Sequence, residues 1–462
     1  MSLLRKKDVL TLQLNEQKSE LKKTLGGFQL TMLGIGAIIG TGIFVLTGVV
    51  AAEKAGPAIM LSFIISGIVC LLAALCYAEF ASTIPVSGSA YTYGYAVFGE
   101  LPGWILGWAL VLEYGLACAT VASGWSGYAQ GILADFGIYL PTAIASAFDP
   151  ANGVYVDLPA ILIICVLTWI LSAGAKESAA LNTFMVILKL AVIVLFIVLG
   201  FRHVDTANWQ PFMPYQFSGV TMGAATVFFA YLGFDAVSTA AEEVKNPQKN
   251  LPIALIASLL VCTILYIAVA AILTGIVPYT ELNVKNPVVF AFQYIDMPWA
   301  AGFISAGSII GITTVLLVML FGQTRLLFSI SRDGLLPKVF SKVSGKTQTP
   351  VKGGWIAAGI ISIFAGFIPL EHLVDLTNIG TLFAFIMVSV GILVLRKKYP
   401  DLPRSFKVPF VPVVPILAVL ACAYLMLQLS IVTWFGFIVW MVFGIIVYFL
   451  YGYRHSLLND KK

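Results

Sequence analysis

Glycines gather in the middle of the first long apolar stretch of the sequence, which covers residues 28–52. The small residues there are Gly34, Gly36, Gly40, Thr41 and Gly42. A glycine inside a helix costs roughly 0.5–1 kcal/mol relative to alanine, and backbone groups left unpaired in lipid cost several kcal/mol each. Irregular backbone is tolerated there only where it lines a cavity, so one interpretation is a helix broken at 40–42 that offers free amides and carbonyls to a ligand. The alternative is close helix packing, because residues 36–40 form a GxxxG motif.

Four ionisable side chains lie inside apolar stretches, namely Glu79, Glu113, Lys189 and Asp235. A charge near the centre of a bilayer costs at least about 2.5–3.5 kcal/mol, so each of them is a candidate for function. Glu113 could attract a cationic ligand or carry a proton, and Lys189 could carry a proton if it is buried. Structural alternatives stay open: Glu79 could reach water, Asp235 could cap a half-helix, and Lys189 could extend to the membrane surface.

The composition indicates a membrane protein that crosses the bilayer many times. Of the 462 residues, 60% are hydrophobic and only 11% are charged, with a mean hydropathy of +0.96, which excludes a set of soluble domains. The net charge of +5 does not indicate nucleic-acid binding, because the basic residues lie in loops between apolar stretches. The six cysteines lie within apolar stretches without CxxC spacing, so neither disulfides nor a metal site is expected. Since no nucleophile motif or His/Cys/Asp cluster is present either, an enzyme is not expected.

Twelve apolar stretches are long enough to cross a bilayer as helices, and we number them as spans 1–12. They cover residues 28–52, 58–82, 102–131, 158–174, 183–201, 219–241, 252–276, 298–328, 354–370, 376–395, 410–428 and 433–452. Of the 27 lysines and arginines, all but four fall on the side of the two termini. The exceptions are Lys54, Arg202 and Lys285 on the other side and Lys189 inside span 5. The positive-inside rule therefore predicts that both termini are cytoplasmic.

Span 6 repeats the irregularity of span 1. Its residues 228–235 place Gly233, flanked by aromatic residues, and the carboxylate of Asp235 within the apolar stretch. The two irregular spans are five spans apart and enter the membrane from opposite sides. Such a pair is typical of inverted-repeat transporters, which bind their substrate at the repeat interface. The pair therefore favours the broken helix over close packing in span 1.

Several stretches carry a resemblance to a known family. Residues 36–44, Gly-Ala-Ile-Ile-Gly-Thr-Gly-Ile-Phe, resemble the first-helix signature of the amino acid–polyamine–organocation (APC) superfamily. Residues 77–80, 85–91, 229–235 and 242–247 are similar to other motifs of that superfamily. The run from Gly107-Trp108 to Leu112-Glu113-Tyr114 looks most like the cationic amino acid transporter branch, and twelve spans resemble its bacterial members.

The resemblance implies an all-α polytopic fold with a five-plus-five inverted repeat, broken helices 1 and 6, and two extra C-terminal helices. On that basis the chain divides into a cytoplasmic tail (1–27), a first repeat of helices 1–5 (28–201), an inverted second repeat of helices 6–10 (219–395), helices 11 and 12 (410–452) and a second cytoplasmic tail (453–462). It also implies alternating-access transport of L-amino acids.

An α-amino acid brings one carboxylate and one ammonium into a site with little water. Amides at the start of a half-helix suit the carboxylate, and those of Thr41, Gly42 and Ile43 are in that position. The ammonium needs carbonyls, which the ends of the preceding half-helices offer. The substrate-binding residues expected by position and by resemblance are Ile38, Ile39, Gly40, Thr41, Gly42, Ile43, Phe229, Ala230, Leu232 and Met319. Phe229 could close over the ligand, and Met319, with Thr313 and Thr314, is expected to line the side-chain pocket; helix packing is the alternative for each.

The coupling residues are also carried over from the superfamily. In its proton-coupled members a lysine on span 5 replaces the sodium ion of sodium-coupled relatives, which makes Lys189 the expected proton carrier and Glu113 the next candidate. The three histidines, His203, His372 and His455, lie at or beyond span ends and are poor carriers. A proton is therefore the expected coupling ion, and no cofactor, metal or sodium ion is expected.

The function expected from these observations is proton-coupled transport of L-amino acids with small neutral or cationic side chains across the cell membrane. An amino-acid exchanger and a non-concentrating sensor or channel of the same fold are the alternatives. The expected partners are the amino acid and the lipid bilayer, without nucleic acid. A small membrane protein or a bound lipid is left open.

Overall fold

The fold of the described residues consists of helices. The computed structural model describes residues 5, 25–84, 89–174, 179–239, 244–345, 347 and 349–458. Within these ranges the only β-pairings are three isolated bridges, and no strand is formed. A helix satisfies its backbone groups within one segment, which is what an apolar surrounding requires. The predicted all-α class is confirmed.

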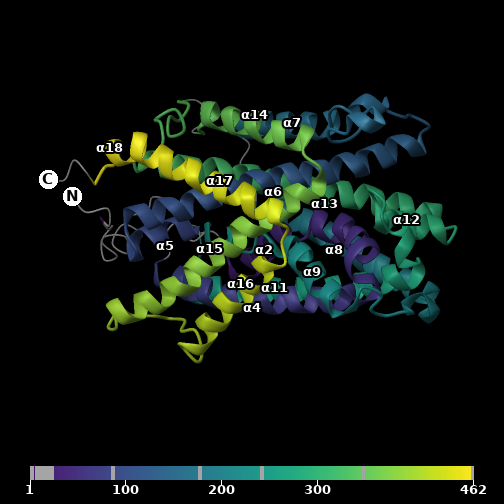
Figure 1. The fold of residues 1–462 in the computed structure, drawn as a ribbon, viewed down its shortest axis with the longest axis horizontal. Coiled ribbons are helices and arrows are strands. Elements are labelled where there is room, and N and C mark those ends of the chain that lie inside the picture. The colour runs from purple at the N-terminus through teal and green to yellow at the C-terminus, as the bar shows by residue number, and fades with distance from the viewer. Residues whose placement is uncertain are drawn as a thin grey trace.

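The long helices run side by side along the longest axis of the molecule (Figure 1). They are α4 (Ile59–Thr83), α6 (Glu100–Asp135), α8 (Ala179–Gly200), α11 (Pro247–Ile276), α13 (Pro298–Arg332) and α15 (Leu370–Lys398). Helices of intermediate length are α2 (Gly27–Ile38), α7 (Leu158–Ser172), α9 (Gln216–Val227), α14 (Val351–Phe367), α16 (Val413–Leu427) and α17 (Ile431–Val447). The short ones are α3 (Thr47–Val50), α5 (Ser89–Val97), α10 (Ala236–Thr239), α12 (Pro287–Tyr294) and α18 (Tyr453–His455).

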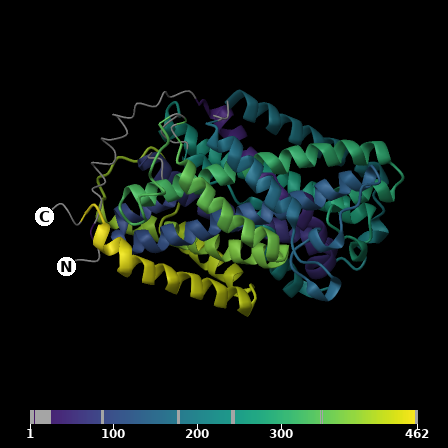
Figure 2. The same cartoon turned by 90° about the horizontal axis from the view of Figure 1, so that it is seen from above.

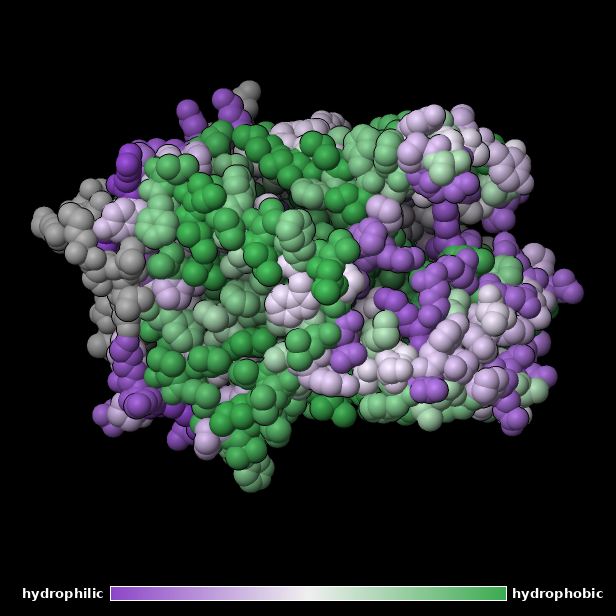
Figure 3. Space-filling view, in the orientation of Figure 1, coloured by the Kyte–Doolittle hydropathy of each residue, from purple (hydrophilic) through white to green (hydrophobic). Residues whose placement is uncertain are grey.

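Seven helical stretches are long and apolar enough to cross a membrane. They are Gly42–Thr83, Glu100–Asp135, Asn182–His203, Pro247–Ile276, Pro298–Arg332, Leu370–Lys398 and Ile431–His455. The shorter apolar helices α2, α7, α14 and α16 accompany them, and each of the twelve predicted apolar ranges contains a helix. The surface supports a membrane-spanning arrangement, because on the face shown in Figure 3 an apolar band lies between two more hydrophilic ends.

The helices pack in two groups that also contact each other directly, α15 against α4 and α13 against α2. In the first, α11 packs against α4 and α2, and α9 packs against α4. In the second, α6 packs against α7, α13, α14 and α15. Helix α8 contacts both groups through α2 and α13, while α17, yellow in Figure 2, lies along the lower edge of the molecule in that view.

Two helices are broken in their middle. Helix α2 ends at Ile38, Ile39 is extended (φ −76°, ψ 104°), and helix resumes at Thr41. We call residues 41–55 the second half-helix; it begins with a π-turn, η1 (Gly42–Leu46), and ends with another, η2 (Ala51–Ala55). The break therefore lies at 39–40, slightly before the predicted 40–42.

The second break follows α9. A 3-10 turn, η8 (Phe228–Tyr231), leads to an extended Leu232 (φ −59°, ψ 145°) and to Gly233 at φ +101°, and helix resumes in α10. A positive φ favours glycine, which explains why glycine occupies this position. We call residues 228–235 the second break.

Candidate functional site

The two breaks lie against each other, and glycines make the contact possible. A Cβ on Gly42 would overlap the Cα of Ala230 in the second break. A Cβ on Gly233 would lie 2.8 Å from the carbonyl oxygen of Ala37 and 2.8 Å from Cε of Met319 on α13. The segments predicted from the sequence are thus brought together, and Met319 packs where they meet.

Thr41 begins the second half-helix with an unpaired hydroxyl. Its side chain is buried, and Oγ1 has no hydrogen-bond partner among the described residues. A Cβ on Gly124 of α6 would overlap the side chain of Thr41, so a glycine there allows α6 to pack closely. A helix leaves its first amides without intrahelical partners, and a buried polar group without a partner costs about 1–3 kcal/mol. This corner can therefore donate several hydrogen bonds to an anionic group.

The carbonyls on the other side of the break are partly occupied. Tyr266 of α11 places its hydroxyl 2.7 Å from the Ala230 oxygen and 3.1 Å from the Ile38 oxygen. The Phe229 oxygen accepts the amide of Leu232 at 3.1 Å. A carbonyl oxygen has two lone pairs, so these groups can still accept a bond from an ammonium. Tyr266 thus ties both breaks together, and a tyrosine within an apolar stretch gives no sign of this role in the sequence.

Lys189 of α8 is completely buried and lies behind the first break. Its ammonium donates to the carbonyl oxygens of Gly36 at 2.7 Å and Ile39 at 3.1 Å, and to the Thr314 hydroxyl at 3.3 Å. The alternative in which Lys189 extends to the membrane surface is therefore excluded. This one side chain links α8, the first broken helix and α13.

Two buried carboxyl groups belong to Asp235, at the end of the second break, and to Glu113 of α6. Tyr114 donates its hydroxyl to Oδ2 of Asp235 at 2.7 Å. Oε2 of Glu113 has no hydrogen-bond partner within the described part of the chain. Glu113 therefore has a free acceptor for a cation or a proton.

The contacts of Glu79 indicate that it stabilises the fold and does not bind a ligand. It is fully buried and forms an ion pair with Arg396, whose Nη2 lies 2.6 Å from Oε2 of Glu79. Arg404 lies 3.4 Å from Oε1, and the amide of Val408 donates to Oε2 at 2.7 Å. These contacts join α4 to the end of α15 and the segment that follows it, and Glu79 does not reach water as one alternative required.

The three residues of α13 expected to line a side-chain pocket face different neighbours. Met319 reaches Gly233, while Thr314 faces Lys189 and Thr313 accepts the indole N–H of Trp125 at 2.9 Å. Of the three, Met319 alone is brought to the junction of the two breaks.

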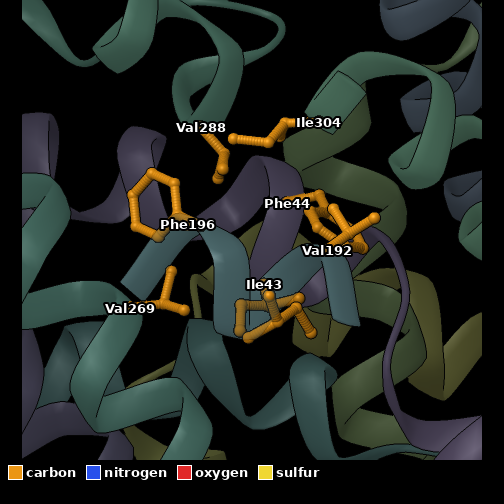
Figure 4. A pocket seen from close by; sticks show the side chains of 8 residues that line it. Ile43, Phe44, Val192, Phe196, Val269, Val288 and Ile304 are labelled. Carbon is orange, nitrogen blue, oxygen red and sulfur yellow. The ribbon is translucent and has the colours of Figure 1, made fainter. Parts of the chain in front are cut away.

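An apolar space borders the second half-helix. It is too small to hold a water molecule and is lined by Ile43, Phe44, Val192, Ile193, Phe196, Val269, Val288 and Ile304 (Figure 4). Hydrocarbon side chains offer no partner to a carboxylate or an ammonium, so a zwitterionic ligand does not fit there. In the described ranges, no group of three or more His, Cys, Asp or Glu residues could hold a metal ion.

Comparisons with known proteins identify the family. The family model for amino acid permeases matches residues 25–451. The methylthioribose transporter of Bacillus subtilis (strain 168) is 52% identical over 458 residues, which cover 99% of each chain. The branched-chain amino acid permease BcaP of the same organism is 51% identical over 463 residues, again 99% of each chain. The vacuolar cationic amino acid transporter 4 of Arabidopsis thaliana is 32% identical over 584 residues, covering 99% of this chain and 97% of that protein.

These relatives are transporters and not enzymes, and they include a cationic amino acid transporter at lower identity than the two Bacillus proteins. The family match together with the apolar helices makes the chain a multi-pass membrane protein. The resemblance seen in the sequence is confirmed: the chain belongs to the amino acid permease family of the APC superfamily.

Proposed function

We propose that the protein imports L-amino acids by proton-coupled alternating access and binds them where its two broken helices meet. The observation that carries this proposal is the buried, unpartnered Thr41 hydroxyl at the start of a half-helix, opposite carbonyls of both breaks. An anion at the helix start and a cation at the carbonyls match the two ends of an α-amino acid. The name of BcaP, an amino acid permease, supports the same substrate class.

Proton coupling is assigned to Lys189 in this proposal. Protonated, its ammonium holds the carbonyls of the first broken helix against α13. Loss of the proton to the cytoplasm removes a donor and the positive charge, so α2 is released and substrate leaves. Glu113 is the second proton carrier to consider because Oε2 has no hydrogen-bond partner within the described residues.

The architecture proposed for this mechanism has twelve spans in a five-plus-five inverted repeat with two further helices. It lies in the cell membrane with both termini in the cytoplasm. The helix in each of the twelve apolar ranges and the two breaks, five spans apart, support it.

A second candidate substrate comes from the relative that is 52% identical and is named a methylthioribose transporter. Methylthioribose has neither a carboxylate nor an ammonium, so it would leave the helix-start amides and Thr41 without a charged partner. The amino acid therefore satisfies this site better.

Uptake into proteoliposomes tests the proposal. We expect an inward proton gradient without sodium to concentrate labelled L-amino acids, and excess methylthioribose to compete poorly. A sodium requirement would overturn the coupling ion. Uptake that needs amino acid inside the vesicles would identify an exchanger, and binding without accumulation would identify a sensor or channel.

A further inference from the structure

The outer part of α6 contacts the second half-helix at two positions on one face. Gly124 accommodates the side chain of Thr41, and Tyr128 lies one turn further on. Tyr128 is fully buried and donates its hydroxyl to the carbonyl oxygen of Phe44 at 2.7 Å. Its ring meets the Phe44 ring edge-on, with centroids 6.3 Å apart and planes at 69°.

The backbone that Tyr128 holds is the π-turn directly after the first break. A π-turn is wider than an α-helix, and such turns are rare and frequently found at functional sites. The bond from the Phe44 amide to the Gly40 oxygen is 3.4 Å long, beyond the usual range for this kind of hydrogen bond. The helix itself therefore anchors the amides of Thr41, Gly42 and Ile43 weakly, and an external contact has to fix their direction.

We propose that Tyr128 is a positioning residue that aims the amides at the start of the second half-helix at the substrate carboxylate. The carbonyl of Phe44 lies one residue after the last of these amides. A hydrogen bond that fixes the orientation of the Phe44 peptide plane therefore also fixes the direction in which the three preceding amides point. This inference rests on the proposed carboxylate site. Tyr128 does not touch the carboxylate itself and acts through the backbone.

The contact also joins the two helix groups. Tyr128 lies on α6 of the second group, and Phe44 lies on the first broken helix, which packs with the first group. The amides of Thr41, Gly42 and Ile43 therefore point toward the carboxylate only while the two helix groups are in contact at Tyr128. Separation of the groups would disorder the site and release the carboxylate.

The test compares ligands that differ only in the carboxylate. Dissociation constants are measured for an L-amino acid and for its decarboxylated amine, with the wild type, Tyr128→Phe and Tyr215→Phe. Tyr215→Phe is the matched control, because its hydroxyl also donates to a π-turn carbonyl of the same half-helix, Ala52, at its far end. We expect Tyr128→Phe to bind the amino acid roughly two- to ten-fold more weakly and the amine equally well. Tyr215→Phe should keep the wild-type ratio.

An equal loss for both ligands, no loss, or the same selective loss in Tyr215→Phe would overturn the role of Tyr128. If the wild type itself bound the amine as tightly as the amino acid, the proposed carboxylate site would fail instead. Tyr128→Met is a second donor-free variant and is expected to show the same selective loss if Tyr128→Phe does not fold. The two failures are thus distinguishable.

Discussion

The missing side chain of Gly42 lets the backbone of the second break lie against the first. The hydrogen on its Cα faces Ala230, and Ala230 in turn receives the hydroxyl of Tyr266. At the scale of single residues, the site depends on close contact between the backbones of the two breaks. A side chain larger than the hydrogen atom of Gly42 would prevent that contact. Thr41 within the site and Lys189 behind the first break then supply polar side-chain groups.

Gly42→Ala should abolish detectable amino acid binding, because the added methyl group overlaps Ala230 and pushes the two breaks apart. The matched control is Gly359→Ala in α14, where an added Cβ meets nothing within 4 Å. The control should keep wild-type affinity and gain up to about 1 kcal/mol of helix stability. Calorimetric titration measures the affinity of each variant and thermal unfolding measures the stability of the control. Unchanged binding by Gly42→Ala would contradict the proposed site.

Asp157, just before α7, should make stability depend on pH. It accepts hydrogen bonds from the Ser126 hydroxyl at 2.6 Å and the Ala160 amide at 3.0 Å. Burial raises the pKa of Asp157 to about 6, although these bonds and Lys285 oppose the shift. The folded protein then holds this proton more tightly than the unfolded chain, so the contribution of Asp157 to stability falls as pH rises from about 4 to 6.

The stability that Asp157 loses between about pH 4 and 6 is at most about 3 kcal/mol. Asp157→Asn keeps both hydrogen bonds without the charge, so its thermal midpoint should exceed that of the wild type above pH 6 and match it near pH 4. Thermal unfolding in detergent between pH 4 and 8 provides the measurement. A constant difference across that range would assign the effect to something other than this carboxyl group.

At the scale of elements, both breaks could be predicted from the sequence because glycines and a carboxylate interrupt otherwise apolar spans. Tyr266 and Tyr128 could not be predicted, since a tyrosine in an apolar span gives no sign of which carbonyl it will meet. Thr313 and Thr314 show the same limit. Neighbours on a helix point about 100° apart, so one faces Trp125 and the other Lys189, and periodicity alone does not tell which face reaches the ligand.

Lys189→Ala should remove the response of uptake to a proton gradient. The substitution removes the ammonium group that joins α8 to the first break and to α13. We expect accumulation to fall to the level set by equilibration, while exchange of labelled for unlabelled amino acid persists. Glu113→Gln serves as the comparison variant. A Lys189→Ala protein that still concentrates substrate with a proton gradient would move the coupling to Glu113.

At the scale of the whole molecule, the two ends of the described chain meet. The carboxylate of Glu100 accepts the hydroxyls of Tyr448 at 2.9 Å and Ser456 at 2.6 Å, and its amide donates to the carbonyl of Arg5 at 2.8 Å. Arg5 also lies over the ring of Tyr453 at 5.0 Å. These contacts support termini on one side of the membrane, which the distribution of basic residues assigns to the cytoplasm.

Cysteine labelling in intact cells checks this orientation. Asn152 and Lys342 are both exposed in loops, and five of the six natural cysteines are buried, so background labelling should be low. A membrane-impermeant reagent should label Asn152→Cys in intact cells and Lys342→Cys only after the cells are opened. The opposite pattern would reverse the orientation of the whole molecule.

The central claim is that the ligand is recognised at both of its charged ends by the backbone where the two broken helices meet. Calorimetric titration of the wild type with one L-amino acid, its N-acetyl derivative, its decarboxylated amine and methylthioribose tests it directly. We expect the amino acid to bind at least roughly ten-fold more tightly than each of the others, because each lacks one or both charges. Equal affinity for the amine or the N-acetyl derivative, or tighter binding of methylthioribose, would contradict the account.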